Sequence, residues 1–170
     1  MGKTDFLKDF GKRIAILRIS HHETQKDLER ALGDIISNRE KNVDGSIVGK
    51  WERGEREMNH LELEGICRRY HADANELLGL LPQQDILPKH RLDLSLKKYI
   101  GHWMSEYRRL HHETQTELAE VLKCKGAAIS KYETGINAIP ISKFKTVCER
   151  YKIDAHDLLR LPQTYKKAKR

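Results

Sequence analysis

The sequence predicts an all-α protein that contains two tandem copies of a five-helix unit. The first observation is an internal repeat, because the motif R-x-x-x-x-E-T-Q begins at Arg18 and again at Arg108. The second is the spacing of apolar residues, which recur three and four positions apart in both copies, as on the buried face of a helix. The third is composition: 6% of the residues are aromatic and 34% are charged, which favours small helical units with aliphatic cores.

The repeat also sets the domain boundaries. The first parts of the two copies match at an offset of 90 residues, whereas the K-W-E-x-G motif ending at Gly54 returns as K-Y-E-x-G at Gly135, an offset of 81. The C-x-R-Y motif, at Cys67 and at Cys148, keeps the offset of 81, so the first copy carries a nine-residue insertion over residues 34–42. We predict a first domain over residues 1–82, a linker over 83–92, a second domain over 93–162 and a basic tail over 163–170.

Apolar stripes and N-caps predict the first two helices of each copy. Thr4 is expected as the N-cap of the first helix, and Asp93 or Ser95 has that role in the second copy. The second helices are expected to begin near Thr24 and Thr114, whose hydroxyls suit an N-cap. The stripes of the first helices are formed by Phe6, Phe10, Ile14 and Leu17, and by Leu96, Ile100, Met104 and Tyr107.

Glycine, proline and aspartate mark the remaining helices. The third helices are expected to end at Gly54 and Gly135, since glycine suits a left-handed cap. The fourth helices are expected over residues 59–70 and 140–151, with Pro140 in the first turn. Short fifth helices are expected after Asp73 and Asp154. Trp51 and Trp103 lie on inward-facing stripes and are expected in the cores.

The stretch over residues 113–135 reads as two short helices joined by a tight turn. Leu118, Val121 and Leu122 have the spacing of one buried stripe, and Ile129 and Tyr132 continue an inward face after the turn. The residues between these inward positions are small or basic, so the second helix could lie close against a polyanion. They are Lys125, Ala127, Ala128, Ser130 and Lys131.

This stretch resembles the helix-turn-helix of the lambda-repressor/Cro-like DNA-binding family. T-Q-x-x-L-A, from Thr114, matches the start of that family's second helix, and I-S-K-Y-E-x-G, from Ile129, matches the end of its third, the recognition helix. The resemblance implies two tandem five-helix lambda-repressor-like helix-turn-helix domains. It also implies a sequence-specific transcriptional regulator, a repressor, which binds double-stranded DNA as a homodimer on a palindromic operator.

The resemblance implies a set of DNA-contacting residues in the second copy. Its members are Thr114, Gln115, Lys125, Gly126, Ala127, Ala128, Ser130, Lys131, Asn137 and Lys143. Within this set, Gln115 is expected to contact the DNA backbone, and Thr114 is expected mainly to cap its helix. Asn137 and Lys143 either hold phosphates or form solvated surface. Two structural ion pairs, Arg18 with Glu52 and Arg108 with Glu133, are implied between helix one and the end of helix three.

Charge distinguishes the two copies. Residues 1–85 carry 14 Lys and Arg against 16 Asp and Glu, whereas residues 86–170 carry 18 against 9. A focused basic field favours a phosphate backbone. The first copy has Glu29 where the second has Ala119, and Asp44 where the second has Lys125. We therefore expect the second copy to read DNA and the first to pair with another chain or to support the second, although two reading copies remain an alternative.

The sequence leaves a second function open, a protein-binding adaptor or antitoxin-like module on the same fold, with the first domain as the partner surface. We expect no enzyme and no cofactor, since no Gly-rich phosphate loop or acid/base constellation is present. Adjacent histidines point about 100° apart on a helix, so the His-His pairs predict no metal site. Three cysteines without a C-x-x-C pair suggest a cytoplasmic protein. No apolar run of about 18 residues predicts a membrane span, and the opening residues predict no signal peptide.

Overall fold

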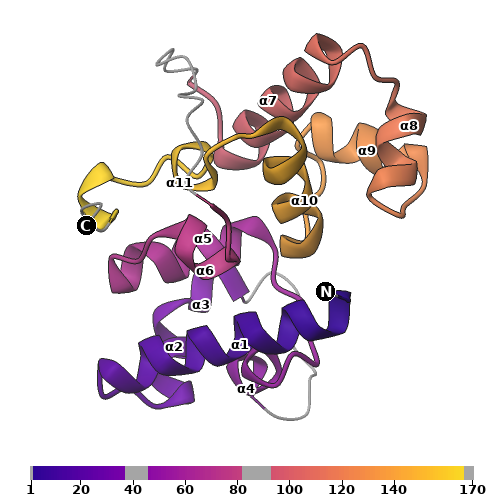
Figure 1. Ribbon diagram of the computed structural model, residues 1–170. Helices are drawn as coiled ribbons and strands as arrows, with labels where there is room; N and C mark the ends of the chain where they lie inside the picture. The colour runs from indigo at the N-terminus through magenta and orange to yellow at the C-terminus, as the bar shows by residue number, and fades with distance from the viewer. Residues whose placement is uncertain (1, 37–45, 82–92, 167–170) are drawn as a thin grey trace.

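The computed structural model describes residues 2–36, 46–81 and 93–166, and this part of the chain is all-α (Figure 1). Within it, no helix is both long and apolar enough to cross a membrane. The helices, in order, are α1 (Lys3–Ser20), α2 (Gln25–Ala31), α3 (Gly33–Ile36), α4 (Ile47–Glu52), α5 (His60–Tyr70), α6 (Ala74–Leu78), α7 (Leu96–Leu110), α8 (Gln115–Val121), α9 (Gly126–Glu133), α10 (Ile141–Tyr151), α11 (Ala155–Leu158) and the 3-10 helix η1 (Gln163–Tyr165).

The described helices before and after the linker follow the same order. By the sequence offsets, α1, α2, α4, α5 and α6 correspond to α7, α8, α9, α10 and α11. Helix α3 begins one residue before the predicted nine-residue insertion of the first copy, and no helix in the described part of the second copy corresponds to it. We call the described residues up to 81 the first module and those from 93 the second module. The division into two domains stays a prediction, and residues 37–45, 82–92 and 167–170, with most of the insertion and the expected linker, lie outside the described residues.

Short-range hydrogen bonds explain where several helices begin and end. The Thr24 and Thr114 hydroxyls accept from the N–H groups three residues later, as expected of N-caps. Gly54 and Gly135 follow α4 and α9 with φ of 71° and 70°, in the left-handed region. The prediction for Thr4 was wrong: α1 begins at Lys3, because the Gly2 N–H donates to the Asp5 carboxylate one turn ahead. Pro140 also lies one residue outside its helix, as the N-cap of α10.

Apolar side chains from the predicted stripes form the cores. Trp51 is 2% exposed, whereas Trp103 is only partly buried against the core. The assignment of Val121 to the buried stripe was wrong, since it is 37% exposed while its neighbour Leu122 is buried. The core of the second module includes Ile100, Met104, Leu118, Leu122, Ile129, Tyr132, Phe144 and Val147. This core fixes α8 and α9 against α7 and α10.

The two modules meet across a pseudo-two-fold axis. Just before α5 and α10, the His60 N–H donates to the Ile139 carbonyl at 3.0 Å, and the Ile141 N–H donates to the Met58 carbonyl at 2.9 Å. These hydrogen bonds are copies of one another, because the offset of 81 residues exchanges His60 with Ile141 and Met58 with Ile139. Reciprocal contacts of this kind characterise a two-fold interface.

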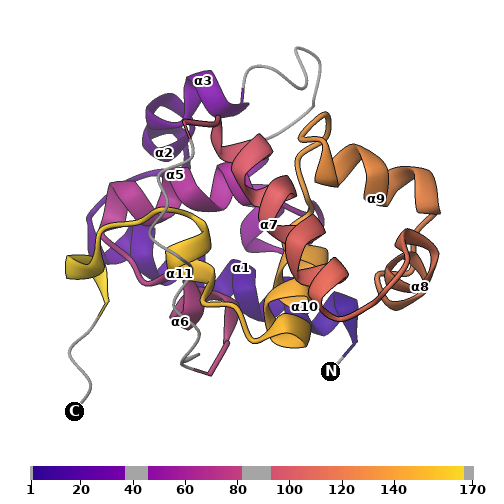
Figure 2. The same ribbon diagram turned by 90° about the horizontal axis from the view of Figure 1, so that it is seen from above.

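A second reciprocal set lies where α6 packs against α11, side by side in Figures 1 and 2. The buried Asn75 side chain donates to Asp154 at 3.0 Å. Its counterpart is the buried His156 ring, with Nδ1 3.5 Å from Asp73. The backbone N–H groups of Ala155 and Ala74 donate to Asn75 and His156, at 3.0 and 3.4 Å respectively. Each module therefore covers, with its own last helices, the equivalent surface of the other.

Candidate nucleic-acid interface

A buried network holds the carboxyl end of α9. Arg108, on α7, donates to both Glu133 oxygens, at 2.6 and 3.1 Å, and to the Glu113 carbonyl at 2.6 Å. The hydrogen bond with Glu133 raises the pKa of Arg108 above its usual value. Gln115 Nε2 donates to the same Glu133 carboxylate at 2.8 Å. Three helices, α7, α8 and α9, are thereby tied to one carboxylate, and the first module repeats the arrangement with Arg18, Gln25 and Glu52.

Close backbone packing fixes the same end of α9. A β-carbon on Gly101 would lie 2.3 Å from the Tyr132 carbonyl oxygen, so only glycine lets α7 approach α9 this closely. Gly11 has the same relation to the Trp51 carbonyl in the first module. Sequence reasoning missed both glycines, although the 90 residues between them equal the offset of the repeat and could have identified them as equivalent positions. The tilt of α9 is therefore set by backbone contact as well as by the ion pair.

The outward side of α9 is small and basic. Lys125, Ala127 and Lys131 are exposed, and Gly126 is partly exposed with open space where a β-carbon would stand. Lys125 is the N-cap, without a side-chain cap hydrogen bond, and no acidic residue lies in the first turn. Ala128 and Ser130 are less available than expected. Ala128 packs partly against the core, and Ser130 is half-buried, its carbonyl accepting from the Thr134 hydroxyl.

The start of α8 is less suited to phosphate than the start of α9. Both the N–H and the hydroxyl of Thr114 donate to Glu117, at 2.6 and 2.8 Å. These hydrogen bonds lower the pKa of Glu117, so its carboxylate stays charged at the helix N-terminus. Thr114 thus has its donors committed to a capping box and supports the helix rather than offering them to a ligand. Gln115 is half-buried and directed to Glu133.

The two flanking residues predicted to hold phosphates differ in their environment. Asn137 is exposed in the turn after α9. Lys143, in the first turn of α10, is half-buried, and its Nζ donates to the Leu122 carbonyl at 2.6 Å. That bond uses one of the three ammonium donors. Lys143 therefore lies at the turn between α8 and α9, close to the start of the predicted recognition helix.

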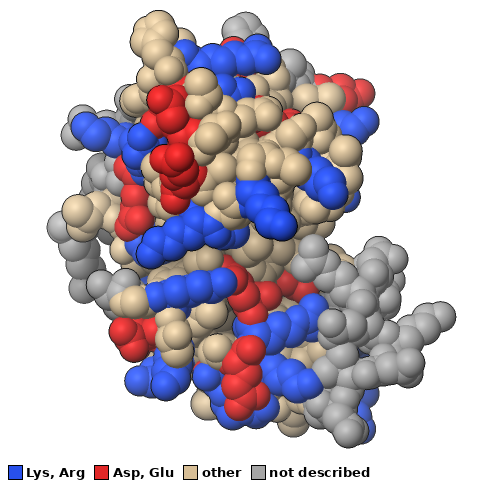
Figure 3. Space-filling view, turned by 90° about the vertical axis from the view of Figure 1, so that its right-hand side faces the viewer, with Lys and Arg blue, Asp and Glu red and all other residues tan. Residues whose placement is uncertain are grey.

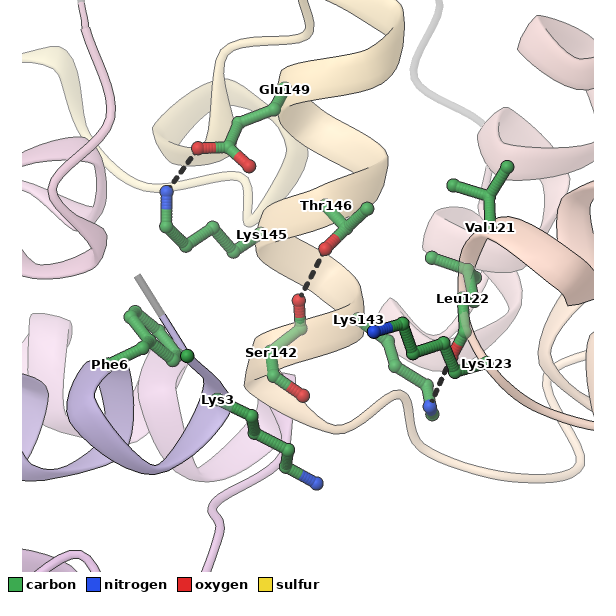
Figure 4. A pocket seen from close by; sticks show the side chains of 11 residues that line it. Lys3, Phe6, Val121, Leu122, Lys123, Ser142, Lys143, Lys145, Thr146 and Glu149 are labelled. Carbon is green, nitrogen blue, oxygen red and sulfur yellow. Dashed lines mark hydrogen bonds and ion pairs between the residues drawn. The ribbon is translucent and has the colours of Figure 1, made fainter.

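A cavity of about 440 Å³ adjoins this turn (Figure 4). Its wall combines the start of α1 in the first module with the first turns of α10 and the end of α8 in the second. Four lysines line it: Lys3, Lys123, Lys143 and Lys145. Sequence reasoning identified only Lys143. Lys123 and Lys145 belong to the same module as Lys143, whereas Lys3 reaches the cavity only because the modules pack. Figure 3 views the face that carries α8, α9 and the start of α1, and Lys and Arg lie over both halves of this face, with Asp and Glu among them.

The equivalent of the α9 N-terminus is blocked in the first module. Glu29, which replaces Ala119, accepts from the Ser46 hydroxyl at 2.6 Å and from the Val48 N–H at 3.1 Å. A carboxylate of the protein therefore occupies the start of α4, where a phosphate would otherwise meet N–H groups. Ala119, in contrast, is buried where α8 meets α9.

Comparison with family models, with curated proteins and with solved structures found no match for this chain. Among the described residues, no group of three or more His, Cys, Asp or Glu side chains is arranged to hold a metal ion.

Proposed function

We propose that this protein is a sequence-specific DNA-binding transcriptional regulator, a repressor, which reads the major groove through α9. The observation that carries this proposal is the outward exposure of Lys125, Ala127 and Lys131 on a helix whose other side is fixed by Arg108 and Glu133. Lysine donates to guanine acceptors and to phosphates, and an alanine methyl contacts a thymine methyl. A rigid helix with this outer face suits groove binding, since small residues allow close approach.

The proposed architecture is two tandem helix-turn-helix domains of the lambda-repressor type. It is supported by the shared helix order of the two modules and by the matching Arg–Glu–Gln networks. A cytoplasmic location belongs to the same proposal and rests on the cysteine pattern, with Cys67, Cys124 and Cys148 all free thiols.

In this proposal the first module replaces the second subunit of a dimeric repressor. The reciprocal contacts of Asn75, Asp154 and their counterparts already join two copies of the unit within one chain. Glu29 at the start of α4 disfavours a phosphate there, since like charges repel. The first module therefore supports α9 rather than reading bases, and one chain binds one duplex.

The test is selection of bound sequences from random duplexes at two salt concentrations, followed by affinity measurements on variants. With about five phosphate contacts, log K should fall with log salt at a slope near −4.5. Lys125→Glu and Lys131→Glu should each weaken binding by more than about tenfold without lowering the unfolding temperature. Lys152→Glu is the matched control, because Lys152 is exposed at the opposite end of α10. Equal affinity of all three variants and the parent would contradict the assignment of α9.

A second candidate function is protein binding by the first module, as an adaptor or antitoxin-like component. Ile16 and Ile19 on α1 are 66% and 61% exposed, which is more apolar surface than a helix facing only water requires. If this is the main function, Ile16→Lys should abolish capture of a defined partner while selected duplexes show no binding to the parent.

A further inference from the structure

We propose that the cavity between the two modules binds a phosphoryl group. The cavity lies between the start of α1, the first turns of α10 and the turn from α8 to α9 (Figure 4). The phosphoryl group has two sources of the same chemistry: a free phosphorylated small molecule, or the backbone of a bound duplex. The second case, and any effect of a free ligand on DNA binding, rest on the proposed function.

Positive charge enters the cavity from both modules. Lys3 comes from α1, Lys123 from the turn before α9, and Lys143 and Lys145 from α10. Ser142 and Thr146 add hydroxyls to the same wall, although the Thr146 hydroxyl donates to the Ser142 carbonyl at 2.9 Å. Phe6 adds apolar surface from α1, and Val121 and Leu122 add it from the opposite side, at the end of α8 (Figure 4). An apolar wall with a few convergent charged groups is typical of a small-ligand site.

The charges of the cavity are only partly neutralised by the protein. Lys3 pairs with Glu57 at 2.6 Å, and Lys145 pairs with Glu149, the one carboxylate among the described residues that line the cavity. Within the described part of the chain, Lys123 and Lys143 form no ion pair with a carboxylate. Lys143 Nζ spends one donor on the Leu122 carbonyl and retains two. Two ammonium groups facing a partly enclosed space favour an anion, since charge-assisted hydrogen bonds to phosphate are strong.

In the first module, the position equivalent to the cavity is filled by side chains, and two of its lysines are replaced by glutamates. There α3 packs on α5, and a β-carbon on Gly65 would lie 2.8 Å from Ile35 of α3. Gly65 is the counterpart of Thr146, which lines the open cavity. The counterparts of Lys143 and Lys145 are Glu62 and Glu64. The same scaffold is therefore filled in the first module and open in the second, and the two carboxylates that replace the two lysines lie close to Arg56 and Arg68. This contrast distinguishes a ligand site from a general packing gap.

An occupied cavity would affect α9. Leu122 and Lys123 belong to the turn that leads directly into α9, whereas Lys3 belongs to the first module. A phosphoryl group that contacts both sides would hold this turn against α1. Binding at the cavity would therefore fix the orientation of α9 relative to the first module, and a free ligand would act as a regulator of DNA binding.

The experiment uses the full chain and the double variant Lys123→Gln/Lys143→Gln, with Lys152→Gln as the control for loss of a surface charge. Pyrophosphate and inorganic phosphate are titrated by calorimetry, and each protein is also tested on a selected duplex. Unfolding temperatures without ligand check that the variants fold. Binding of pyrophosphate by the parent, weakened at least about tenfold in the double variant and unchanged in Lys152→Gln, would support a free ligand.

The remaining outcomes also decide the proposal. If the parent ignores both free anions but the double variant alone loses duplex affinity, the cavity holds a backbone phosphate. If neither anion nor duplex binding changes in the double variant, the cavity is not a phosphoryl site. A parent that binds pyrophosphate but no duplex would contradict the proposed function and leave the cavity site supported.

Discussion

Asn59 and Pro140 pair with each other as an antiparallel bridge, although they occupy equivalent positions in the two copies. Equivalent residues can meet in this way only where a two-fold axis passes between them. The chain is thus arranged like a dimer, with both copies on one polypeptide.

This arrangement predicts that the protein acts as a single copy. The last helices of the second module are already covered by the first module, where α6 packs against α11. We expect light scattering to give the mass of one 19.8 kDa chain in the absence of DNA, and one chain per duplex at saturation. Two chains per duplex, bound cooperatively, would contradict the replacement of a second subunit and leave the reading role of α9 intact.

The interface between the modules should contribute measurably to stability. Asn75 is 6% exposed and forms hydrogen bonds with Asp154 and with the Ala155 N–H. Asn75→Ala would leave these buried partners incompletely satisfied, which costs about 1–3 kcal/mol. Chemical denaturation should therefore show a lower free energy of unfolding, or a separate early transition of one module. Asn137→Ala removes an exposed amide and is the control, with an expected change within about 0.5 kcal/mol.

The sequence was informative about helices and much less about the contact between modules. Thr24 and Thr114 cap their helices through partners three residues away, so a local motif contains the whole interaction. Asn75 and Asp154 are 79 residues apart, and helical periodicity does not mark either as an interface residue. The misassignment of Val121 has the same origin, because spacing does not distinguish a core position from one that lines a cavity between modules.

Residues of the candidate site were predictable where a local sequence pattern contains them, and not where only packing between the modules brings them together. Lys125 and Lys131 were proposed because they lie within the stretch over residues 113–135, and both are exposed. Lys3 and Lys123 line one cavity, but 120 positions of sequence separate them and only the packing of α1 near α10 brings them together. Ala128 was expected at the interface, yet it packs partly against the core. Thr114 forms a capping box, which agrees with the N-cap role expected of it.

Two glycines should respond oppositely to alanine. Gly101→Ala would force a β-carbon within 2.3 Å of the Tyr132 carbonyl, so α7 and α9 must separate and the unfolding temperature should fall by several degrees. Gly126→Ala meets no atom within 4 Å and lies in the first turn of α9, so stability should be unchanged or rise by up to about 1 kcal/mol. Calorimetry of both variants gives the comparison.

The variants Gly101→Ala and Gly126→Ala also distinguish an effect on stability from an effect on DNA binding. The new methyl of Gly126→Ala would face outward, toward the proposed groove, and should alter duplex affinity at unchanged stability. A Gly101→Ala variant as stable as the parent would show that α7 does not approach the Tyr132 carbonyl of α9 this closely.

Acid should weaken the second module through Glu113. This carboxylate accepts from Arg150 and, at 2.6 Å, from the Tyr151 hydroxyl, and the Arg150 hydrogen bond is the main cause that holds its pKa below the usual value. A carboxyl whose folded pKa is depressed contributes stability above its unfolded pKa of about 4.5 and loses it as the pH falls through the folded value. Glu113→Gln should therefore be less stable than the parent at pH 7 and lose less stability between about pH 5 and pH 3.

Thermal unfolding of both proteins across that pH range measures the effect, and Glu23→Gln is the matched variant. Glu23 accepts from Arg69 and Tyr70 in the first module, where the Arg69 hydrogen bond likewise lowers its pKa. Each single variant should lose less stability than the parent as the pH falls. The double variant should lose still less, because the two sites lie in different modules and their effects should add. If the unfolding temperatures of the parent and Glu113→Gln fall equally as the pH is lowered, the Arg150 contact does not persist in solution.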